Sequence, residues 1–383
     1  MANTLGVYNP TFYANEALIQ LEKALGMAGR VHRGFEEERN SFGLGETINI
    51  RKPSTFTAQD APSTAQDVST ETVAVTLDHW KEVKFKLTDK ELAFTGDRII
   101  NDHIRPAAYA IANDIDQKLT GLYKDIPWFH TLNAAPGSVV SDLTGPRQVM
   151  FDNAVPLGSD IHYMVDGTLE AGLLGNSAFA QWQGAGQEGV ATQMRGAMGM
   201  RYGFELFANQ NVDSHTSGTA STGSLLLNGA VAVGDTTIAL DAGSVTGTLV
   251  PGDSFVIAGN TQRYAVTNTV TAASNAFAGV TITPAIVAVA ADNTSVTVTL
   301  QTTDAENLAF HKNAFALALA PLPEHGSELG ARVTTIQDPV TGLTIRARIY
   351  YVGNSSEVHV ALDVLYGFKT LDPNLAVRCH DNA

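Results

Sequence analysis

Apolar residues recur at helical spacing in two segments of the chain. In residues 11–27 the apolar positions follow one another at steps of three or four, and the charged residues lie off that stripe. Residues 98–123 carry the longest pattern of this kind, so both segments are predicted to be helices. Pro106 lies inside the second one and is expected to kink it or to mark its true start. The first helix fits equally an arm that packs on a neighbouring chain and a helix that packs on its own domain.

Apolar and polar residues alternate on both sides of a long polar stretch. The alternation runs through residues 47–51, stops at the segment 53–69, which is rich in Ser, Thr, Ala and Pro, and resumes in residues 73–77 and 83–87. Two long strands around a mobile tip would form an extended β-arm. An ordinary hairpin with a disordered loop explains the pattern as well, although a tip of about 17 residues is long for a compact domain.

Residues 216–304 differ sharply in composition from the rest of the chain. They contain five Asp residues and a single base, Arg263, and they lack Lys, Glu, His, Cys and Trp. Short runs with β-propensity alternate with turn residues, which predicts a small all-β barrel or sandwich. The predicted strands are residues 236–240, 254–257, 263–267, 280–282 and 295–300. Mixed composition returns at Glu306, so the segment is predicted to be an insertion.

Strand patterns also flank this segment, and together with the helices they predict an α+β core. The predicted strands of the core are residues 161–165, 204–208, 333–336, 343–351 and 358–365, and the tail 375–379 alternates weakly.

The net charge limits the kinds of molecule that the chain is expected to bind. The net charge is −15, and charged residues make up only 16% of the chain, against the usual quarter. An acidic chain is poorly suited to gripping phosphates, although it could line a space that holds nucleic acid without binding it. Solubility alone is the stronger explanation of the negative charge. The small charged fraction indicates an exterior largely covered by partners.

The sequence offers no convincing catalytic, cofactor or metal site. Cys379 is the only cysteine, which excludes an intramolecular disulfide and a multi-cysteine metal site, and a core thiol is expected. Gly184, Gly186 and Gly189 match a dinucleotide-loop pattern, but no βαβ pattern surrounds them, so a flexible glycine-rich loop is expected. The expectation is therefore a protein that is not an enzyme and has no cofactor.

The remaining candidates for chemistry favour structural roles. His79, His103 and His311 lack the spacing of metal ligands and are expected to be satisfied structural residues. The acidic triplet of residues 36–38 could form an acid/base pair, but a solvated or intersubunit charge cluster is the stronger interpretation. No signal peptide and no run of about 18 apolar residues is found, which favours a soluble cytoplasmic product without a membrane partner.

Several segments resemble the major capsid proteins of tailed bacteriophages with the Hong Kong 97 type fold. Within that family the chain is most similar to coat proteins of the short-tailed phage P twenty-two kind. The segments that carry the resemblance are Val31 to Glu36, Gly45 to Pro53, Asp78 to Phe85, Asp97 to Leu119, Asn307 to Lys312, Ile345 to Arg348, Leu362 to Gly367 and Pro373 to Val377. Their order and spacing together, rather than any one motif, make the likeness specific.

The resemblance implies a division of the chain into five parts. Residues 1–45 would be an N-terminal arm, and residues 46–88 an E-loop that reaches over a neighbouring subunit. Residues 89–215 would form the first part of a peripheral and axial core, with a spine helix at 97–123. Residues 216–304 would be an inserted all-β domain, and residues 305–383 the second part of the core.

The resemblance also implies self-assembly into hexamers and pentamers of an icosahedral shell around phage DNA, in a virion built in the host cytoplasm. A portal and, because no long N-terminal scaffolding segment is present, a separate scaffolding protein are expected partners. DNA would be met only by non-specific proximity. The tip 53–69 has no lysine, so covalent crosslinking is not expected. Candidate assembly contacts are Glu36, Glu37, Arg39, Arg51, Lys52, Phe56, Trp80 and Lys81.

Two other classes of protein fit the sequence less well than a shell protein does. A secreted or surface adhesin with a β-sandwich module explains the Thr-rich insertion, but adhesins carry signal peptides and usually tandem modules. A hydrolase with a binding module lacks a nucleophile and base.

Overall fold

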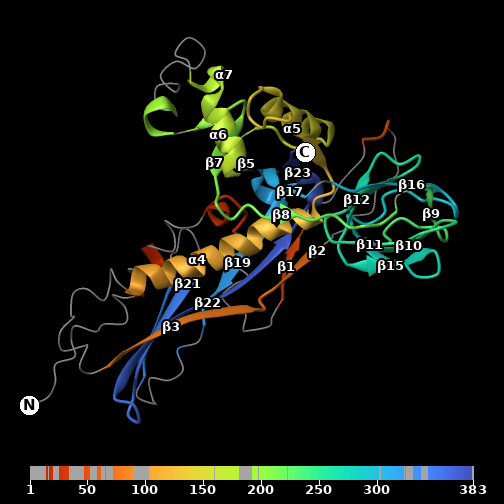
Figure 1. Ribbon diagram of the computed structural model, residues 1–383. Coiled ribbons are helices and arrows are strands. Elements are labelled where there is room, and N and C mark those ends of the chain that lie inside the picture. The colour runs from red at the N-terminus through yellow and green to blue at the C-terminus, as the bar shows by residue number, and fades with distance from the viewer. Residues whose placement is uncertain are drawn as a thin grey trace, which may run out of the picture. The chain divides into compact units, whose positions relative to one another are not determined.

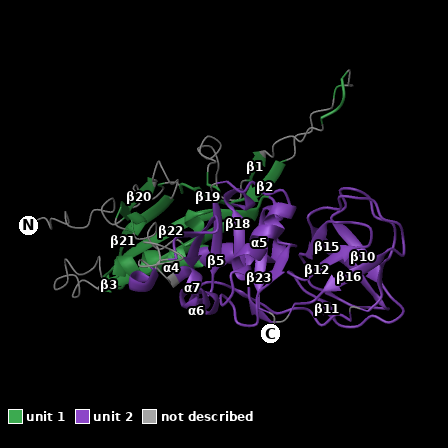
Figure 2. Ribbon diagram, turned by 90° about the horizontal axis from the view of Figure 1, so that it is seen from above, with its two compact units in different colours: residues 1–115, 316–371 green, residues 116–315, 372–383 purple. Residues whose placement is uncertain are grey.

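The computed structural model describes most of the chain as two compact units, shown in different colours in Figure 2. Unit 1 comprises residues 1–115 and 316–371, and unit 2 comprises residues 116–315 and 372–383. The described residues are 14–15, 17–19, 26–33, 47–51, 58–61, 65, 72–88, 103–158, 160–180, 192–196, 198–221, 223–301, 303–322, 324, 331–337 and 344–381.

Unit 1 is built around a five-stranded sheet. Its strands are β3 (His79–Thr88), β19 (Phe315–Ala320), β20 (Arg332–Gln337), β21 (Thr344–Val352) and β22 (Glu357–Thr370). The order is β19-β22-β21-β20, and β3 also pairs with β22. Every residue from His79 to Thr88 pairs antiparallel with a residue of β22. Because side chains alternate between faces, Val83 and Phe85 share one face of β3 and Glu82 and Lys84 the other.

The main helix of unit 1, α4 (Arg105–Thr120), lies along this sheet (Figure 1). Its buried residues up to the unit boundary are Ala107, Ala108, Ile111, Ala112 and Ile115. The Tyr366 hydroxyl of β22 donates to Asp114 Oδ2 of the helix at 2.6 Å. Pro106 lies in the first turn of α4, where no partner for its missing N–H is needed. The expected start at Pro106 is confirmed, and the helix continues past Thr120 as the 3₁₀ turn η5 (Gly121–Asp125).

The predicted β-arm is only partly as expected. Strands β1 (Thr47–Arg51) and β2 (Thr72–Thr76) pair antiparallel, with Ile48 opposite Val75. The prediction of two long strands is wrong, because the second one divides at residues 77–78 and its distal half, β3, belongs to the five-stranded sheet. Leu77 explains the division, since it is fully buried in a cluster with Ile48 and Val75.

Unit 2 contains a six-stranded mixed sheet. Its strands, in spatial order, are β4 (Phe129–Thr131), β23 (Ala376–His380), β18 (Asn307–His311), β5 (Ile161–Val165), β7 (Phe204–Ala208) and β6 (Met200–Arg201). The strands predicted at 161–165 and 204–208 are confirmed. Helices α5 (Ser141–Asp152), α6 (Gly167–Gly175) and α7 (Ser177–Ala180) also belong to this unit.

Local chemistry explains how these helices begin and pack. Asp166 is the N-cap of α6, where its carboxylate accepts hydrogen bonds from the N–H groups of Thr168 and Leu169. A side chain at Gly172 would place its Cβ 1.8 Å from the Pro136 carbonyl oxygen, so only glycine allows α6 this close to the preceding loop.

Residues 216–304 contain a closed six-stranded barrel (Figure 1). Its strands, in order around the barrel, are β10 (Thr237–Asp241), β15 (Ala276–Thr283), β13 (Arg263–Val266), β12 (Ser254–Ile257), β16 (Ser295–Thr299) and β9 (Leu225–Leu227). Strands β11 (Thr248–Leu249) and β14 (Val270–Thr271) form a separate pair. The interior is apolar and includes Phe255 stacked on Tyr264 with ring centroids 5.5 Å apart.

The chain enters and leaves the barrel through a two-stranded neck. Strand β8 (Ser214–His215) pairs antiparallel with β17 (Asp304–Ala305), with His215 opposite Asp304. Three short 3₁₀ turns, η2 (Met27–Gly29), η6 (Lys312–Ala314) and η8 (Pro373–Leu375), complete the described elements. Of the helix predicted at 11–27, residues 14–15 and 17–19 are helical, residues 11–13, 16 and 20–25 lie outside the described residues, and Met27 belongs to η2.

Candidate functional site

Two of the eight predicted assembly residues, Trp80 and Lys81, have described side chains. Both lie in β3 and are exposed, and as neighbours in a strand they point to opposite faces. Lys81 forms an ion pair with Asp114, with Nζ and Oδ1 3.6 Å apart. The backbone of Arg51 lies in β1. The other predicted residues, Glu36, Glu37, Arg39, Lys52 and Phe56, are outside the described part of the chain.

Trp80 is held by a buried carboxylate. Its indole Nε1 donates to Asp363 Oδ2 at 3.1 Å, although 49% of the residue remains exposed. Asp363 is fully buried and also accepts a hydrogen bond from Arg346 Nε at 3.0 Å. Arg348 Nη2 lies 3.2 Å from the same carboxylate and 2.6 Å from Glu82. An exposed indole fixed in orientation is well suited to a contact with another chain, because little side-chain entropy is lost on binding.

A second polar group, which we call the polar joint, lies where the barrel meets the six-stranded sheet of unit 2. It consists of Tyr123, His215, Asp253, Glu306 and Arg378, each of which is at most 2% exposed. His215 lies in the neck strand β8, Glu306 directly follows the neck strand β17, Asp253 belongs to the barrel, and Arg378 lies in β23. Buried ionisable groups need partners, and here the partners come from both sides of the junction.

Asp253 and His215 connect a barrel turn to the neck. The Asp253 carboxylate accepts hydrogen bonds from the N–H groups of Val250 at 2.9 Å and Gly218 at 3.2 Å. It also lies 3.4 Å from His215 Nε2, and His215 Nδ1 lies 3.3 Å from the Tyr123 hydroxyl. A neutral ring with its proton on Nε2 satisfies both nitrogens, because the hydroxyl of Tyr123 then donates to Nδ1.

Arg378 connects the same barrel turn to the sheet. Its Nη1 donates to the Gly252 carbonyl oxygen at 2.8 Å and lies 3.8 Å from Glu306 Oε1. Burial raises the pKa of Glu306, and the positive charge of Arg378 opposes that rise. The polar joint therefore fixes the position of the barrel on the six-stranded sheet. If the turn at Gly252 and Asp253 moved away, Arg378 would lose the Gly252 carbonyl group and Asp253 would lose His215.

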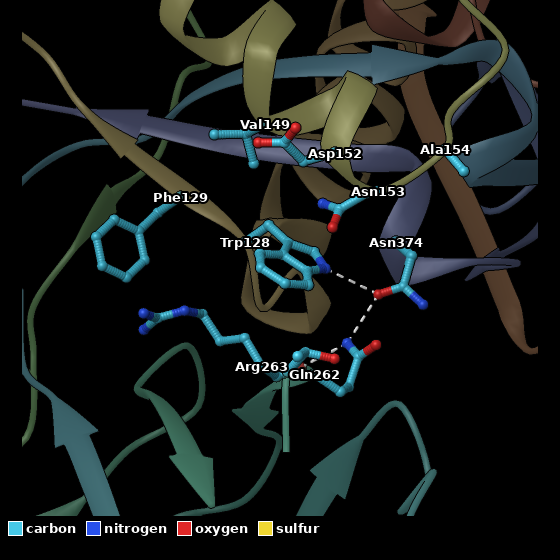
Figure 3. A pocket seen from close by; sticks show the side chains of 10 residues that line it. Trp128, Phe129, Val149, Asp152, Asn153, Ala154, Gln262, Arg263 and Asn374 are labelled. Carbon is cyan, nitrogen blue, oxygen red and sulfur yellow. Dashed lines mark hydrogen bonds between the residues drawn. The ribbon is translucent and has the colours of Figure 1, made fainter. Parts of the chain in front are cut away.

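Beside the polar joint, a cleft opens between the barrel and the sheet (Figure 3). It has a volume of about 600 Å³ and is lined by Trp128, Phe129, Val149, Asp152, Asn153, Ala154, Thr261, Gln262, Arg263 and Asn374. The Asn374 side-chain oxygen accepts hydrogen bonds from Trp128 Nε1 and Gln262 Nε2, both at 2.9 Å. The Arg263 guanidinium lies over the Phe129 ring, 4.5 Å from its centroid. The first residues of β13 are thus joined to the core by aromatic and amide contacts.

The described groups that could carry chemistry are engaged in packing. Cys379 is fully buried, and burial raises the pKa of its thiol, which disfavours the reactive thiolate. His79 lies against Asp78, the His103 ring lies 5.5 Å from that of Phe85, and His311 Nδ1 accepts from the Asn313 N–H. These contacts are compatible with the structural roles predicted for the three histidines.

Among the residues that the structure describes, no group of three or more His, Cys, Asp or Glu side chains could hold a metal ion. No described helix is both long enough and apolar enough to cross a membrane. The glycine pattern at Gly184, Gly186 and Gly189 lies outside the described residues.

Sequence reasoning did not single out the polar joint or the cleft. Arg378 carries the clearest local signal, because a charged residue interrupts the otherwise apolar run of residues 375–379. Arg263 was noted as the single base of residues 216–304, but its partner Phe129 is remote in sequence. Such contacts have no periodicity that a pattern analysis could detect.

Comparisons with known proteins show a similarity of fold to solved structures. No family model matches the chain, and no curated protein matches it. A chain of Mycobacterium phage Che8 is 14% identical, with 93% of this chain and 90% of that chain covered and a TM-score of 0.50. The capsid structure of the Cyanophage P-SCSP1u is 12% identical, covers 92% and 86%, and has a TM-score of 0.47.

A third solved structure gives a weaker likeness of fold. The asymmetric unit of the mature capsid of bacteriophage PhiM1 is 11% identical, covers 89% of this chain and 82% of that chain, and has a TM-score of 0.44. At these identities the likeness concerns the fold, and the chain shares its mixed helix-and-strand architecture with the phage Che8 chain over nearly the whole length of both.

Proposed function

We propose that this chain is the major capsid protein of a tailed bacteriophage, of the Hong Kong 97 type. The observation that carries the proposal is the shared fold with a phage chain over 93% of the residues. The match covers nearly the whole of both chains, which supports a common role for the entire fold. Two proteins that had only one module in common would match over that module alone. The role is structural rather than enzymatic.

In this role, copies associate by heterologous contacts that close into hexamers and pentamers, and these close into an icosahedral shell around DNA. Each contact can be weak, since many act together. The net charge of −15 suits a wall that does not bind the packaged DNA tightly. A separate scaffolding protein and a portal complete the assembly in the host cytoplasm.

The parts of the chain take the roles that the sequence resemblance implies. Residues 1–45 are the N-terminal arm, residues 46–88 the E-loop, and residues 89–215 with 305–383 the peripheral and axial core. The likeness within this family is to coat proteins of the P twenty-two kind. Glu36, Glu37, Arg39, Arg51, Lys52, Phe56, Trp80 and Lys81 are the candidate assembly contacts.

The barrel of residues 216–304 is proposed to be an inserted domain that stabilises the folded subunit. Its own apolar core, its two-stranded neck and the polar joint support this role. The turn at Gly252 and Asp253 supplies one hydrogen-bond partner each to the buried side chains of Arg378 and His215.

Negative-stain electron microscopy of the purified full-length chain, alone and after co-expression with candidate scaffolding proteins, tests the function. Shells, rings or open tubes of regular subunits are expected. A chain that remains monomeric at high concentration under every condition would contradict the proposal. Closed, uniform shells from the chain alone would argue against a separate scaffolding protein. A ladder of multimers on denaturing gels would argue against assembly without covalent crosslinks.

A further inference from the structure

Two segments at one end of the barrel run side by side. Residues 231–235 precede β10 and residues 286–290 follow β15, and these two strands pair in the barrel (Figure 1). Val231 and Ala290 exchange two backbone hydrogen bonds, at 2.9 and 3.2 Å, and the main chain of Ile286 forms two more at the other end of the pair, at 2.8 and 2.9 Å. The two segments are therefore held in one fixed arrangement.

The side chains that these segments expose are all apolar. Val231 and Ile286 belong to the barrel core, whereas Val233, Val287 and Val289 are 63%, 50% and 75% exposed, respectively. Paired segments lie about 5 Å apart and rise about 3.4 Å per residue, so the exposed side chains lie close together on one surface. This surface, which we call the valine patch, consists of Ala232, Val233, Val287, Ala288 and Val289.

The valine patch offers no free charge to a ligand. The acids beside it are Asp235 and Asp292, and each of these carboxylates accepts a backbone N–H hydrogen bond at 2.7 Å. The single base of residues 216–304, Arg263, lies at the cleft instead. An acidic ligand therefore finds no counter-charge at the patch, and a basic one finds only carboxylates that are already bound. The chemistry of the patch fits an apolar, uncharged surface.

These properties favour a second copy of this chain as the occupant. Two copies that each carry a net charge of −15 repel one another, and the repulsion is weakest where the facing surfaces are uncharged. An apolar patch is also complementary to a copy of itself, as a twofold contact requires, whereas a charged patch repels its copy. Small side chains on a fixed backbone let two such patches lie against each other with little loss of entropy.

We propose that the valine patches of two copies pack against each other about a twofold axis and so join the barrels of neighbouring subunits. The inference rests on the proposed shell function, which brings many copies side by side. A surface of this size, on the order of 300 Å², is far below the roughly 800 Å² per partner of a stable pair of chains. The contact is therefore weak by itself and becomes effective where other contacts already hold the copies close.

Crosslinking of cysteine variants of the full-length chain tests the proposal. The native Cys379 is fully buried, so its thiol should give no background. Val289→Cys, treated with a short bismaleimide at high protein concentration, should give at least about fivefold more dimer on a denaturing gel than Ser244→Cys. Ser244 is the matched control, because it is also exposed but follows the opposite end of β10.

A pair of charged variants distinguishes a second copy from any other partner. Val287→Asp and Val287→Lys, each combined with Val289→Cys, put like charges on facing patches, so the dimer yield should fall at least about fivefold. An equimolar mixture of the two variants puts opposite charges face to face and should restore at least about half of the yield. Both positions are exposed, so folding should be unaffected, which circular dichroism would verify.

Equal dimer yields from Val289→Cys and Ser244→Cys, or no recovery in the mixture, would overturn the proposal, because the patch would then not meet its own copy. Electron microscopy of the same samples reports separately on shells. Shells without a patch-dependent crosslink would refute the patch contact and leave the shell function standing. Patch-dependent crosslinks in a chain that forms no shells would do the reverse, so the two proposals can fail separately.

Discussion

At the scale of single residues, the buried carboxylate of Asp363 interacts with two guanidinium groups and an indole of unit 1. It accepts hydrogen bonds from Arg346 and Trp80, and Arg348 lies 3.2 Å away. Because Asp363 is fully buried, water cannot take the place of a partner that its carboxylate loses. The orientation of the exposed Trp80 indole therefore depends on a carboxylate that is shielded from solvent.

Replacing Asp363 by Asn should destabilise the chain by about 3–5 kcal/mol, because two guanidinium groups then lose their buried counter-charge. The measurement is the free energy of unfolding in urea, followed by tryptophan fluorescence. Glu82→Gln is the matched control, since Glu82 also binds Arg348 but is exposed, and its loss should cost less than about 1 kcal/mol. Similar effects of the two substitutions would contradict the central role of Asp363.

His380 should make the stability of unit 2 sensitive to pH. Burial, with the positive charge of Arg378 and the neighbouring histidines, lowers the pKa of His380 from 6.5 to about 4. The unfolded chain therefore binds a proton between these values and the folded chain does not. The resulting stability is present above pH 6.5 and is lost as the pH falls towards 4, by about 2 kcal/mol between pH 7 and pH 5.

Urea unfolding of the chain and of His380→Gln at several pH values would measure this dependence. The variant should lose less stability than the original chain between pH 7 and pH 5. His79→Gln, which replaces a histidine of unit 1, is the control and should not reduce the loss. An unchanged pH dependence in His380→Gln would contradict the prediction.

At the scale of elements, the barrel and its neck show how a module can be carried within another fold. The neck strands bring Ser214 opposite Ala305, and paired residues of antiparallel strands lie about 5 Å apart. The insertion therefore starts and ends at nearly the same point, so the strands of the core need not move to accommodate it. The polar joint then adds side-chain contacts around this neck.

Replacing residues 216–304 with a short linker of about four residues should be geometrically possible but should lower the soluble yield and the free energy of unfolding. The reason is that Arg378 loses the Gly252 carbonyl group and His215 loses Asp253. The same deletion with Arg378→Met, which removes the stranded charge, should recover part of the stability. Unchanged assembly and solubility after the simple deletion would contradict a stabilising role for the barrel.

At the scale of the whole molecule, charge is the main obstacle to self-association. Copies that each carry a net charge of −15 repel one another at long range. Only 16% of the residues are charged, so short-range contacts between uncharged surfaces can still provide the attraction. Assembly of such a chain is therefore expected to depend on ionic strength.

Raising the salt concentration from about 50 to 300 mM should accelerate assembly, because the screening length falls from about 14 Å to about 6 Å. Light scattering after mixing would follow the rate, and electron microscopy would show whether the products are ordered. Sucrose at matched viscosity is a control that leaves the charges unscreened. Slower assembly at higher salt would indicate that attractive ion pairs, rather than overall repulsion, dominate the contacts.

Much of the secondary structure could be predicted from local patterns. Strands β5, β7 and β12 begin and end where alternation or β-propensity places them, and Pro106 marks the start of α4. Helix α5 was missed because Gly145 and Pro146 interrupt its pattern, and β9 was missed because its three leucines do not alternate with polar residues. Both are stabilised by packing in a buried core rather than by local propensity.

The sequence by itself determined those helix and strand segments that have a regular apolar pattern, and the composition of residues 216–304, because periodicity and composition are properties of neighbouring residues. It also determined that Arg263 is the single base of that segment. Only the tertiary structure decided that β3 pairs with β22, that Arg378 reaches the turn at Gly252, and that Arg263 stacks on Phe129. These contacts join residues far apart in the chain, and they form because packing of apolar faces brings the strands together and each buried charge then requires a partner.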